Sequence, residues 1–73
     1  MMTKQDLERY VGTHVDTKVQ IWSDRRGERI PAHTTLFVKE VVGEQHFNLT
    51  WPGLGGKRAA NQIHYTKLFL TAR

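Results

Sequence analysis

Three glycines and a Lys-Arg pair follow a tryptophan and a proline in WPGLGGKRAANQIHY, residues 51–65, a composition found in phosphate-binding loops. A GxxxxGK(S/T) loop would need glycine in place of Trp51 and serine or threonine in place of Arg58. The dinucleotide fingerprint would need its third glycine at Arg58 and a surrounding βαβ unit. The sequence therefore does not predict a nucleotide site. The stretch is either a plain connection or a loop that grips a partner through Lys57 and Arg58.

Histidines at positions 14, 33, 46 and 64 raise the question of a metal site. They lie in separate predicted segments, without the short spacing of metal-binding motifs and without any cysteine nearby. No Ser-His-Asp or His-carboxylate combination can be assembled from local spacing. The sequence therefore predicts no metal site, no cofactor and no enzymatic activity.

Exposed aromatic and basic side chains remain as candidates for binding. Trp22 falls on the polar phase of an alternating segment. The tetrapeptide that follows Ser23 suits a type I turn, with Asp first and Gly fourth, and this turn would place Arg25 and Arg26 at its tip. A tryptophan beside arginines is typical of binding hot spots. The alternative is that Trp22 caps the end of the core.

Length and charge limit the classes of protein to consider. The 73 residues are expected to form a single domain, residues 1–73, with a thin core. A net charge of +4 favours an acidic partner, either nucleic acid or an acidic protein surface. The absence of cysteine suits a reducing cytoplasm, and no apolar run is long enough for a signal peptide or a bilayer span. We expect a cytoplasmic monomer that does not contact membranes.

Local patterns predict the first two elements. A capping box at Thr3 and Asp6, and a stop at Gly12, predict a helix over residues 4–11 whose apolar stripe must dock on the rest of the chain. Alternation over residues 15–21 predicts a half-buried strand. The inward side chains of that strand would be Val15, Thr17, Val19 and Ile21.

The segment TTLFVKEVVGEQHFNLTW, residues 34–51, is the best hairpin pattern, with Gly43-Glu44 as a two-residue turn. In this register residue 42 faces residue 45. The pairs along one face would be Glu40 with Phe47, Val38 with Leu49 and Leu36 with Trp51, which places Trp51 in the core. The reverse face would carry Phe37 and Val41, and it would either lie under the helix or form a contact surface.

Residues 61–65 are expected to form a short strand with Ile63 and Tyr65 inward, and residues 67–70 a last turn or strand. The fold class is therefore α+β: a short N-terminal helix followed by a small antiparallel β-meander, which can curl into a partly open SH3-like barrel. A flat meander with the helix packed across it is the alternative.

Read as one small basic domain, TKQDLERYVGTHVDTKVQIWSDRRGERIPAHTTLFVKEVVGEQHFNLTWPGLGG resembles the small bacteriophage-encoded inhibitors of host bacterial RNA polymerase, of the Xanthomonas phage type, that also act as antiterminators. The resemblance covers the whole chain through its length and overall character, and it carries no residue roles. It implies binding to the large β′ and β subunits of RNA polymerase in the bacterial host cytoplasm. It also implies interference with σ-factor engagement at promoters, and help to elongating polymerase in passing terminators.

Two hypotheses follow. In the first, the chain is a transcription regulator that binds RNA polymerase through apolar contacts from Trp22, Phe37 and Val41. The basic rim of this contact would consist of Arg25, Arg26, Lys57 and Arg58. In the second, the chain is a small non-enzymatic RNA- or DNA-binding barrel that uses the same basic tips on phosphates. Nothing in the sequence signals recognition of particular bases.

Overall fold

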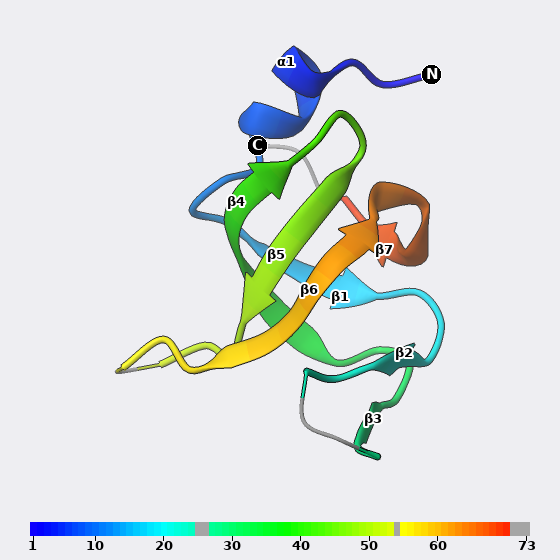
Figure 1. The fold of residues 1–73 in the computed structure, drawn as a ribbon, viewed down its shortest axis with the longest axis vertical. Helices are drawn as coiled ribbons and strands as arrows, with labels where there is room; N and C mark the ends of the chain where they lie inside the picture. The colour runs from blue at the N-terminus through cyan, green and yellow to red at the C-terminus, as the bar shows by residue number, and fades with distance from the viewer. Residues whose placement is uncertain (25–26, 54, 71–73) are drawn as a thin grey trace.

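The computed structural model of the chain describes residues 1–24, 27–53 and 55–70. Its elements in chain order are α1 (Lys4–Glu8), β1 (His14–Thr17), β2 (Ile21–Trp22), β3 (Arg29–Ile30), β4 (Thr35–Val42), β5 (His46–Thr50), β6 (Arg58–His64), the 3₁₀ helix η1 (Tyr65–Lys67) and β7 (Leu68–Phe69). Helix α1 lies at one end of the long axis, and the β2–β3 hairpin lies at the other (Figure 1). The predicted α+β class is confirmed.

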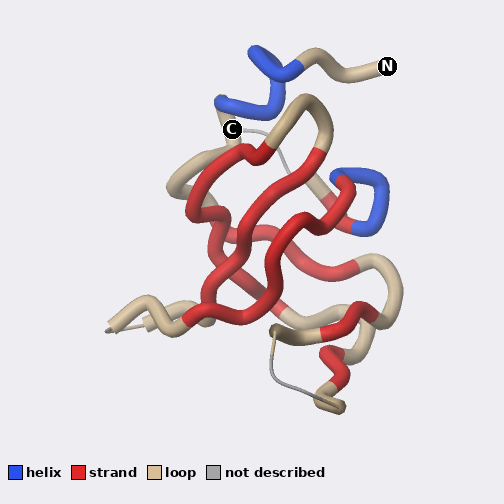
Figure 2. The backbone as a smooth tube through the Cα atoms, viewed as in Figure 1, coloured by secondary structure: helices blue, strands red, loops and turns tan. Residues whose placement is uncertain are grey.

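The strands form one five-stranded sheet and one separate hairpin. The sheet order is β6-β5-β4-β1-β7, and all its pairs are antiparallel. Strands β4, β5 and β6 form the predicted meander, whereas β7 returns to the opposite edge beside β1 (Figure 2). Because β6 and β7 are the two edges and do not pair in the described part of the chain, the sheet is open and is not closed into a barrel.

Helix α1 begins at the predicted capping box. The Thr3 N–H donates to Asp6 Oδ2 at 3.0 Å, and the Asp6 N–H donates to Thr3 Oγ1 at 3.1 Å. The helix is shorter than predicted, because it ends at Glu8 and the chain then turns to Gly12, whose φ is +86°. Leu7 is fully buried, but Val11 is exposed because the helical period does not extend that far.

The predicted strand over residues 15–21 is broken after Thr17. The buried Thr17 hydroxyl donates to Pro31 O at 2.8 Å and accepts from the Thr34 N–H at 2.9 Å. These bonds fasten the end of β1 to the segment that returns from the β2–β3 hairpin. The chain leaves the sheet beyond this point, so Val19 is exposed and its predicted inward position is wrong. Ile21 is buried as predicted.

The β4–β5 hairpin has a different turn from the predicted one. Its loop contains three residues, so Val42 pairs with His46. A bulge at Lys39 adds one residue to β4, and this offsets the extra residue in the loop. Val38 therefore pairs with Leu49, as the sequence predicted.

Between the loop and the bulge the predicted register is wrong. Glu40 pairs with Asn48, and Val41 pairs with the fully buried Phe47. Because strand side chains alternate between faces, the bulge turns Val41 inward, where it packs on the core. Phe37, before the bulge, stays on the outer face. The prediction that Phe37 and Val41 share one outer face is therefore wrong.

Strand β6 begins at Arg58, earlier than predicted, and it is irregular. Its register against β5 shifts twice, with the extra residues on β6, and Gln62 has a φ of +55°. Such bulges bend a strand and increase its twist. Ile63 points inward as predicted, whereas Tyr65 is only partly buried in η1.

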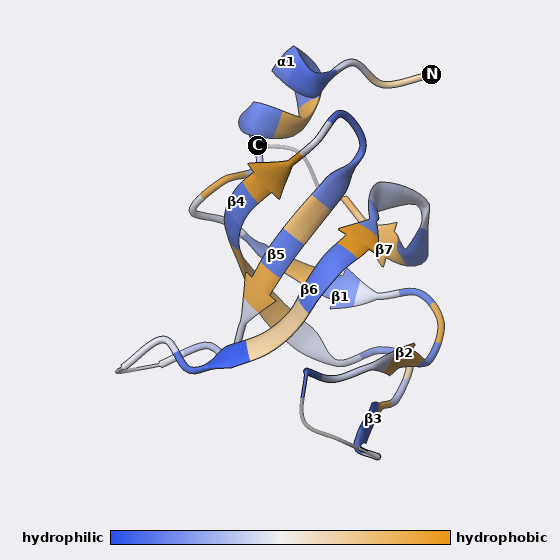
Figure 3. Cartoon of the chain, viewed as in Figure 1, coloured by the Kyte–Doolittle hydropathy of each residue, from blue (hydrophilic) through white to orange (hydrophobic). Residues whose placement is uncertain are grey.

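The core lies on the inner face of the sheet, with one buried side chain from α1, Leu7, and two from the hairpin, Ile21 and Ile30. Strand β5 shows the expected alternation of apolar and polar residues along its length (Figure 3). Its inward side chains, Phe47 and Leu49, are fully buried. Trp51 does not continue this pattern, because β5 ends at Thr50, and the residue is 36% exposed. The predicted core position of Trp51 is therefore wrong.

The two positions differ in what their truncation should cost. Leu49→Ala should lower the free energy of unfolding by about 2–5 kcal/mol, because it leaves a cavity in a fully packed site. Trp51→Ala should cost less than half as much, since its side chain borders solvent. Urea unfolding followed by circular dichroism measures both. Equal costs would mean that the indole belongs to the core.

The capping box predicts an acid-dependent stability. Two hydrogen bonds with Thr3 hold the pKa of Asp6 below its ordinary value of 3.8. The bond from the Thr3 backbone N–H has the larger effect, and the bond with the Thr3 side chain has the smaller one. A carboxyl whose pKa is lower in the folded state stabilises the fold above its unfolded pKa, and it loses this effect as the pH falls through the folded pKa.

The free energy of unfolding of the wild type should therefore fall more steeply than that of Asp6→Asn below about pH 4. Urea melts at a series of pH values measure the difference. Parallel curves for the two proteins would show that the cap does not couple to Asp6 ionisation.

Candidate functional site

An open groove of about 430 Å³ lies on the outer face of β1, β4 and β5, next to the loop that joins β5 to β6. We call it the outer groove. Its lining residues are His14, Phe37, Lys39, Thr50, Trp51, Pro52, Gly53 and Gly56.

The outer groove is bordered by aromatic side chains from β1, from β4 and from the end of β5. His14 and Phe37 are paired residues of β1 and β4, and their rings meet edge to face, with 5.3 Å between centroids and 71° between planes. The Trp51 N–H donates to Lys57 O at 2.8 Å, which holds the backbone of the tryptophan at the base of the loop. Phe37 is half-buried, and Trp51 is more exposed. Two aromatic side chains therefore border one groove.

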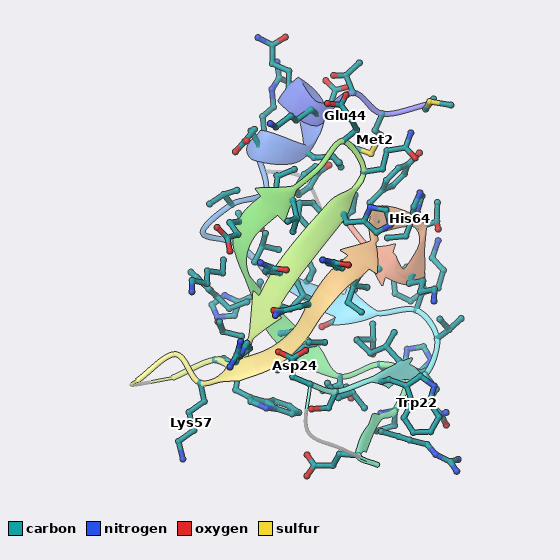
Figure 4. The ribbon with its side chains drawn as sticks, viewed as in Figure 1. Met2, Trp22, Asp24, Glu44, Lys57 and His64 are labelled. Carbon is teal, nitrogen blue, oxygen red and sulfur yellow. The ribbon has the colours of Figure 1, made fainter. Side chains whose placement is uncertain are left out.

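The glycines of this loop allow backbone conformations with positive φ, which other residues rarely adopt. Gly53, Gly55 and Gly56 have φ values of +109°, +93° and +49°, and a Cβ added at any of them would meet no atom within 4 Å. The positive φ angles agree with the sequence prediction, but within the described residues no close approach of another segment requires these glycines. Lys57 follows them, and its side chain extends away from the sheet into solvent (Figure 4).

The charge of the outer groove is positive. Lys39 is the charged residue among its described lining, and Lys57 directly follows the lining residue Gly56. Two carboxylates lie on the same face outside the lining: Asp16 Oδ1 accepts from the Thr35 hydroxyl at 2.6 Å, and Glu40 Oε2 accepts from the side chain of its pairing partner on β5 at 2.7 Å. These neutral donors leave both carboxylates charged, so the positive charge is confined to the lining and the adjoining loop. The lining therefore suits an anionic group.

Sequence reasoning placed Phe37 on a candidate contact face, but it missed the groove because it placed Trp51 in the core and weighed His14 only as a metal ligand. One signal was available. Pro52 has no backbone N–H and restricts the residue before it, so a paired strand is expected to end at or before Trp51. The proline therefore marked the point at which the indole leaves the alternating pattern.

A second surface lies on the β2–β3 hairpin. Trp22 is 59% exposed, and it pairs with Arg29 across the hairpin. The centre of its ring lies 5.2 Å from the Arg29 guanidinium. We call Trp22 and Arg29 the Trp22 surface. The prediction that Trp22 is exposed is confirmed, and it does not cap the core. The predicted site residues Arg25 and Arg26 lie outside the described residues.

Polar contacts hold this hairpin against β6. Asp24 Oδ2 lies 3.2 Å from Arg58 Nε, and its Oδ1 accepts from the Asn61 N–H at 3.1 Å (Figure 4). The Asp24 N–H and the Ser23 hydroxyl both donate to Ala59 O, at 3.0 and 2.9 Å. Arg58 therefore has a structural partner, which the sequence did not predict.

The structure does not gather the predicted contact residues on one face. Phe37 lines the outer groove and Lys57 follows its loop, whereas Trp22 lies on the hairpin. Val41 packs inward, and Arg58 pairs with Asp24. The single apolar centre with a basic rim is thus replaced by two separate surfaces.

Two of the histidines meet, although they lie far apart in the sequence. The rings of His46 and His64 are 5.0 Å apart, edge to face. His64 Nε2 lies 3.1 Å from Gln45 Oε1, and its Nδ1 accepts from the Thr66 N–H at 3.2 Å. Both ring nitrogens of His64 are therefore occupied within the protein. Across residues 1–24, 27–53 and 55–70, no three His, Cys, Asp or Glu side chains are grouped to hold a metal ion.

The described part of the chain has no helix with the length and apolar character that crossing a membrane requires. A scan with protein-family models found no match, and neither did searches for similar curated proteins or for similar solved structures.

The contacts of Asp24 can be separated by two substitutions. Asp24→Ala removes both the ion pair with Arg58 and the acceptor for the Asn61 N–H, and it should cost about 1–2 kcal/mol. Asp24→Asn keeps an acceptor oxygen and should cost less than about 1 kcal/mol, since the ion pair is partly exposed.

Amide hydrogen exchange locates the effect. The Asn61 amide should exchange faster in Asp24→Ala than in Asp24→Asn, because only the first variant leaves it without its acceptor. Equal exchange in both variants would mean that the hairpin is not held to β6 through this side chain.

Proposed function

We propose that the chain is a phage transcription regulator that binds host bacterial RNA polymerase, inhibits promoter-dependent initiation by interfering with σ-factor engagement, and acts as an antiterminator. The proposal combines the resemblance described above with one structural observation, the Trp22 surface. Tryptophan and arginine are the residue types that most often dominate the binding energy of protein interfaces. Here they are stacked on each other and exposed on the hairpin.

The Trp22 surface is suited to binding because it is held in place before a partner arrives. The contacts of Asp24 and Ser23 with β6 attach the strand that carries Trp22 to the main sheet. Ordering a loop or a side chain on association costs free energy, so a surface that is already positioned binds more tightly. An indole on a fixed hairpin can therefore act as an anchor in a pocket of the partner.

The protein is large enough for a protein contact of standard size. A standard interface buries about 800 Å² on each partner, which is roughly one sixth of the 5034 Å² surface of this chain. One face around the hairpin can supply that area. The effect on transcription would then come from binding alone. A regulator that binds more tightly to polymerase without σ than to polymerase with σ shifts the population toward the σ-free enzyme. By reciprocity, bound σ lowers the affinity of polymerase for the regulator by the same factor.

The proposal predicts that Trp22 is required for polymerase binding. Immobilised wild-type protein should retain the β and β′ subunits from a nuclease-treated bacterial lysate. Trp22→Ala should bind purified polymerase at least about 30-fold more weakly, as expected for a hot-spot residue. Its urea unfolding should be nearly unchanged, because the side chain is mostly exposed.

Phe69→Ala is the matched control, since Phe69 is also an exposed aromatic residue, 41% accessible, but lies on β7. It should bind polymerase like the wild type and should still inhibit promoter-dependent transcription in a purified system. Failure of the wild type to retain polymerase would contradict the proposal. Equal binding by Trp22→Ala would remove the Trp22 surface from it.

A further inference from the structure

The outer groove has the shape and lining to hold a flat ring. Its volume of about 430 Å³ lies in the range of small-molecule sites, about 300–1,000 Å³. Phe37, on β4, and Trp51, at the end of β5, both border it. The edge contact with His14 constrains the Phe37 ring, so one stacking surface is positioned in advance. Aromatic side chains on the face of a small sheet are the usual platform for unpaired bases.

The cations around the groove suit an anionic ligand. Lys39 lines the groove, and Lys57 extends from the adjoining loop (Figure 4). A lysine ammonium is a point charge that can pair with a phosphate or a carboxylate, so the lysines do not distinguish the two. The aromatic lining does, because an unpaired base has a flat face that stacks on Phe37 or Trp51 and an acidic side chain has none. A nucleic acid strand therefore fits the rings and the lysines together better than an acidic peptide.

We infer that the outer groove binds single-stranded nucleic acid, with Phe37 and Trp51 stacking on bases and Lys39 and Lys57 contacting phosphates. A duplex hides the faces of its bases, so stacking selects an unpaired strand. The site is separate from the Trp22 surface, and the inference goes beyond the proposed function.

Fluorescence of Trp51 tests the inference directly. In a Trp22→Phe background, Trp51 is the only tryptophan, and a base that stacks on it should quench its emission. Short oligouridylate and oligodeoxythymidylate strands should each quench saturably at about 50 mM salt, and binding should weaken toward about 200 mM. Quenching by either strand supports the inference, whereas duplex DNA should bind at least about ten-fold more weakly.

Substitutions assign the binding to the groove. Phe37→Ala should weaken binding by about ten-fold, which corresponds to one lost stacking contact. Lys39→Gln and Lys57→Gln should each lower the log-log salt slope by about 0.7, the value expected for one phosphate contact with a single strand. The matched controls are Phe69→Ala and Lys67→Gln, exposed residues outside the groove lining, and both should bind like the wild type.

Three results would overturn the inference. The first is the absence of saturable quenching by both single strands at low salt. The second is equal binding by the wild type, Lys39→Gln and Lys57→Gln. This result does not depend on whether Phe37→Ala folds. The third is quenching by oligoglutamate as strong as that by the nucleic acid strands, which would assign the groove to an acidic protein segment. The assay contains no polymerase, so its outcome is independent of the proposed function.

Discussion

The extra residue at Lys39 is the constraint on which both the core and the outer groove depend. Strand β4 lies between β1 and β5, so its side chains face the core on one side and the outer face on the other. A continuous strand would place Phe37 and Val41 on the same face. The bulge separates them, with Val41 on the core and Phe37 beside His14 in the groove.

A chain of this length cannot bury all its large side chains. Two of the aromatic rings that remain exposed lie against cations. Trp22 lies beside the Arg29 guanidinium, and Phe69 lies 5.2 Å from the Lys18 ammonium. Cation–π contacts of this kind hold an exposed ring in place at a modest gain in free energy. Trp22 and Phe69 therefore each have a cation beside the ring. The functional proposals rest on Trp22 on the hairpin and on Phe37 and Trp51 in the groove.

Local signals predicted the parts of the fold that local physics determines. The capping box of α1 and the pairing of Val38 with Leu49 were both readable from residue types and alternation. The bulge at Lys39 was not, because a two-residue and a three-residue loop fit the same glycine, and only the packed sheet distinguishes them. In the sequence, Trp51 continues the alternation of Phe47 and Leu49, which predicted a core position. In the structure β5 ends at Thr50, so the alternation no longer decides which way Trp51 faces. The ion pair that fixes the hairpin joins residues distant in sequence, so no local pattern could have indicated it.

The most direct measurement is an NMR titration of isotope-labelled protein that follows the two tryptophan indole N–H signals, one from the groove and one from the hairpin. Addition of a short single-stranded oligonucleotide should move the Trp51 indole signal and the amide signals of the other groove residues, while the Trp22 indole signal stays in place. Movement of the Trp22 signal with an unchanged Trp51 signal would contradict the assignment of separate roles to the two surfaces.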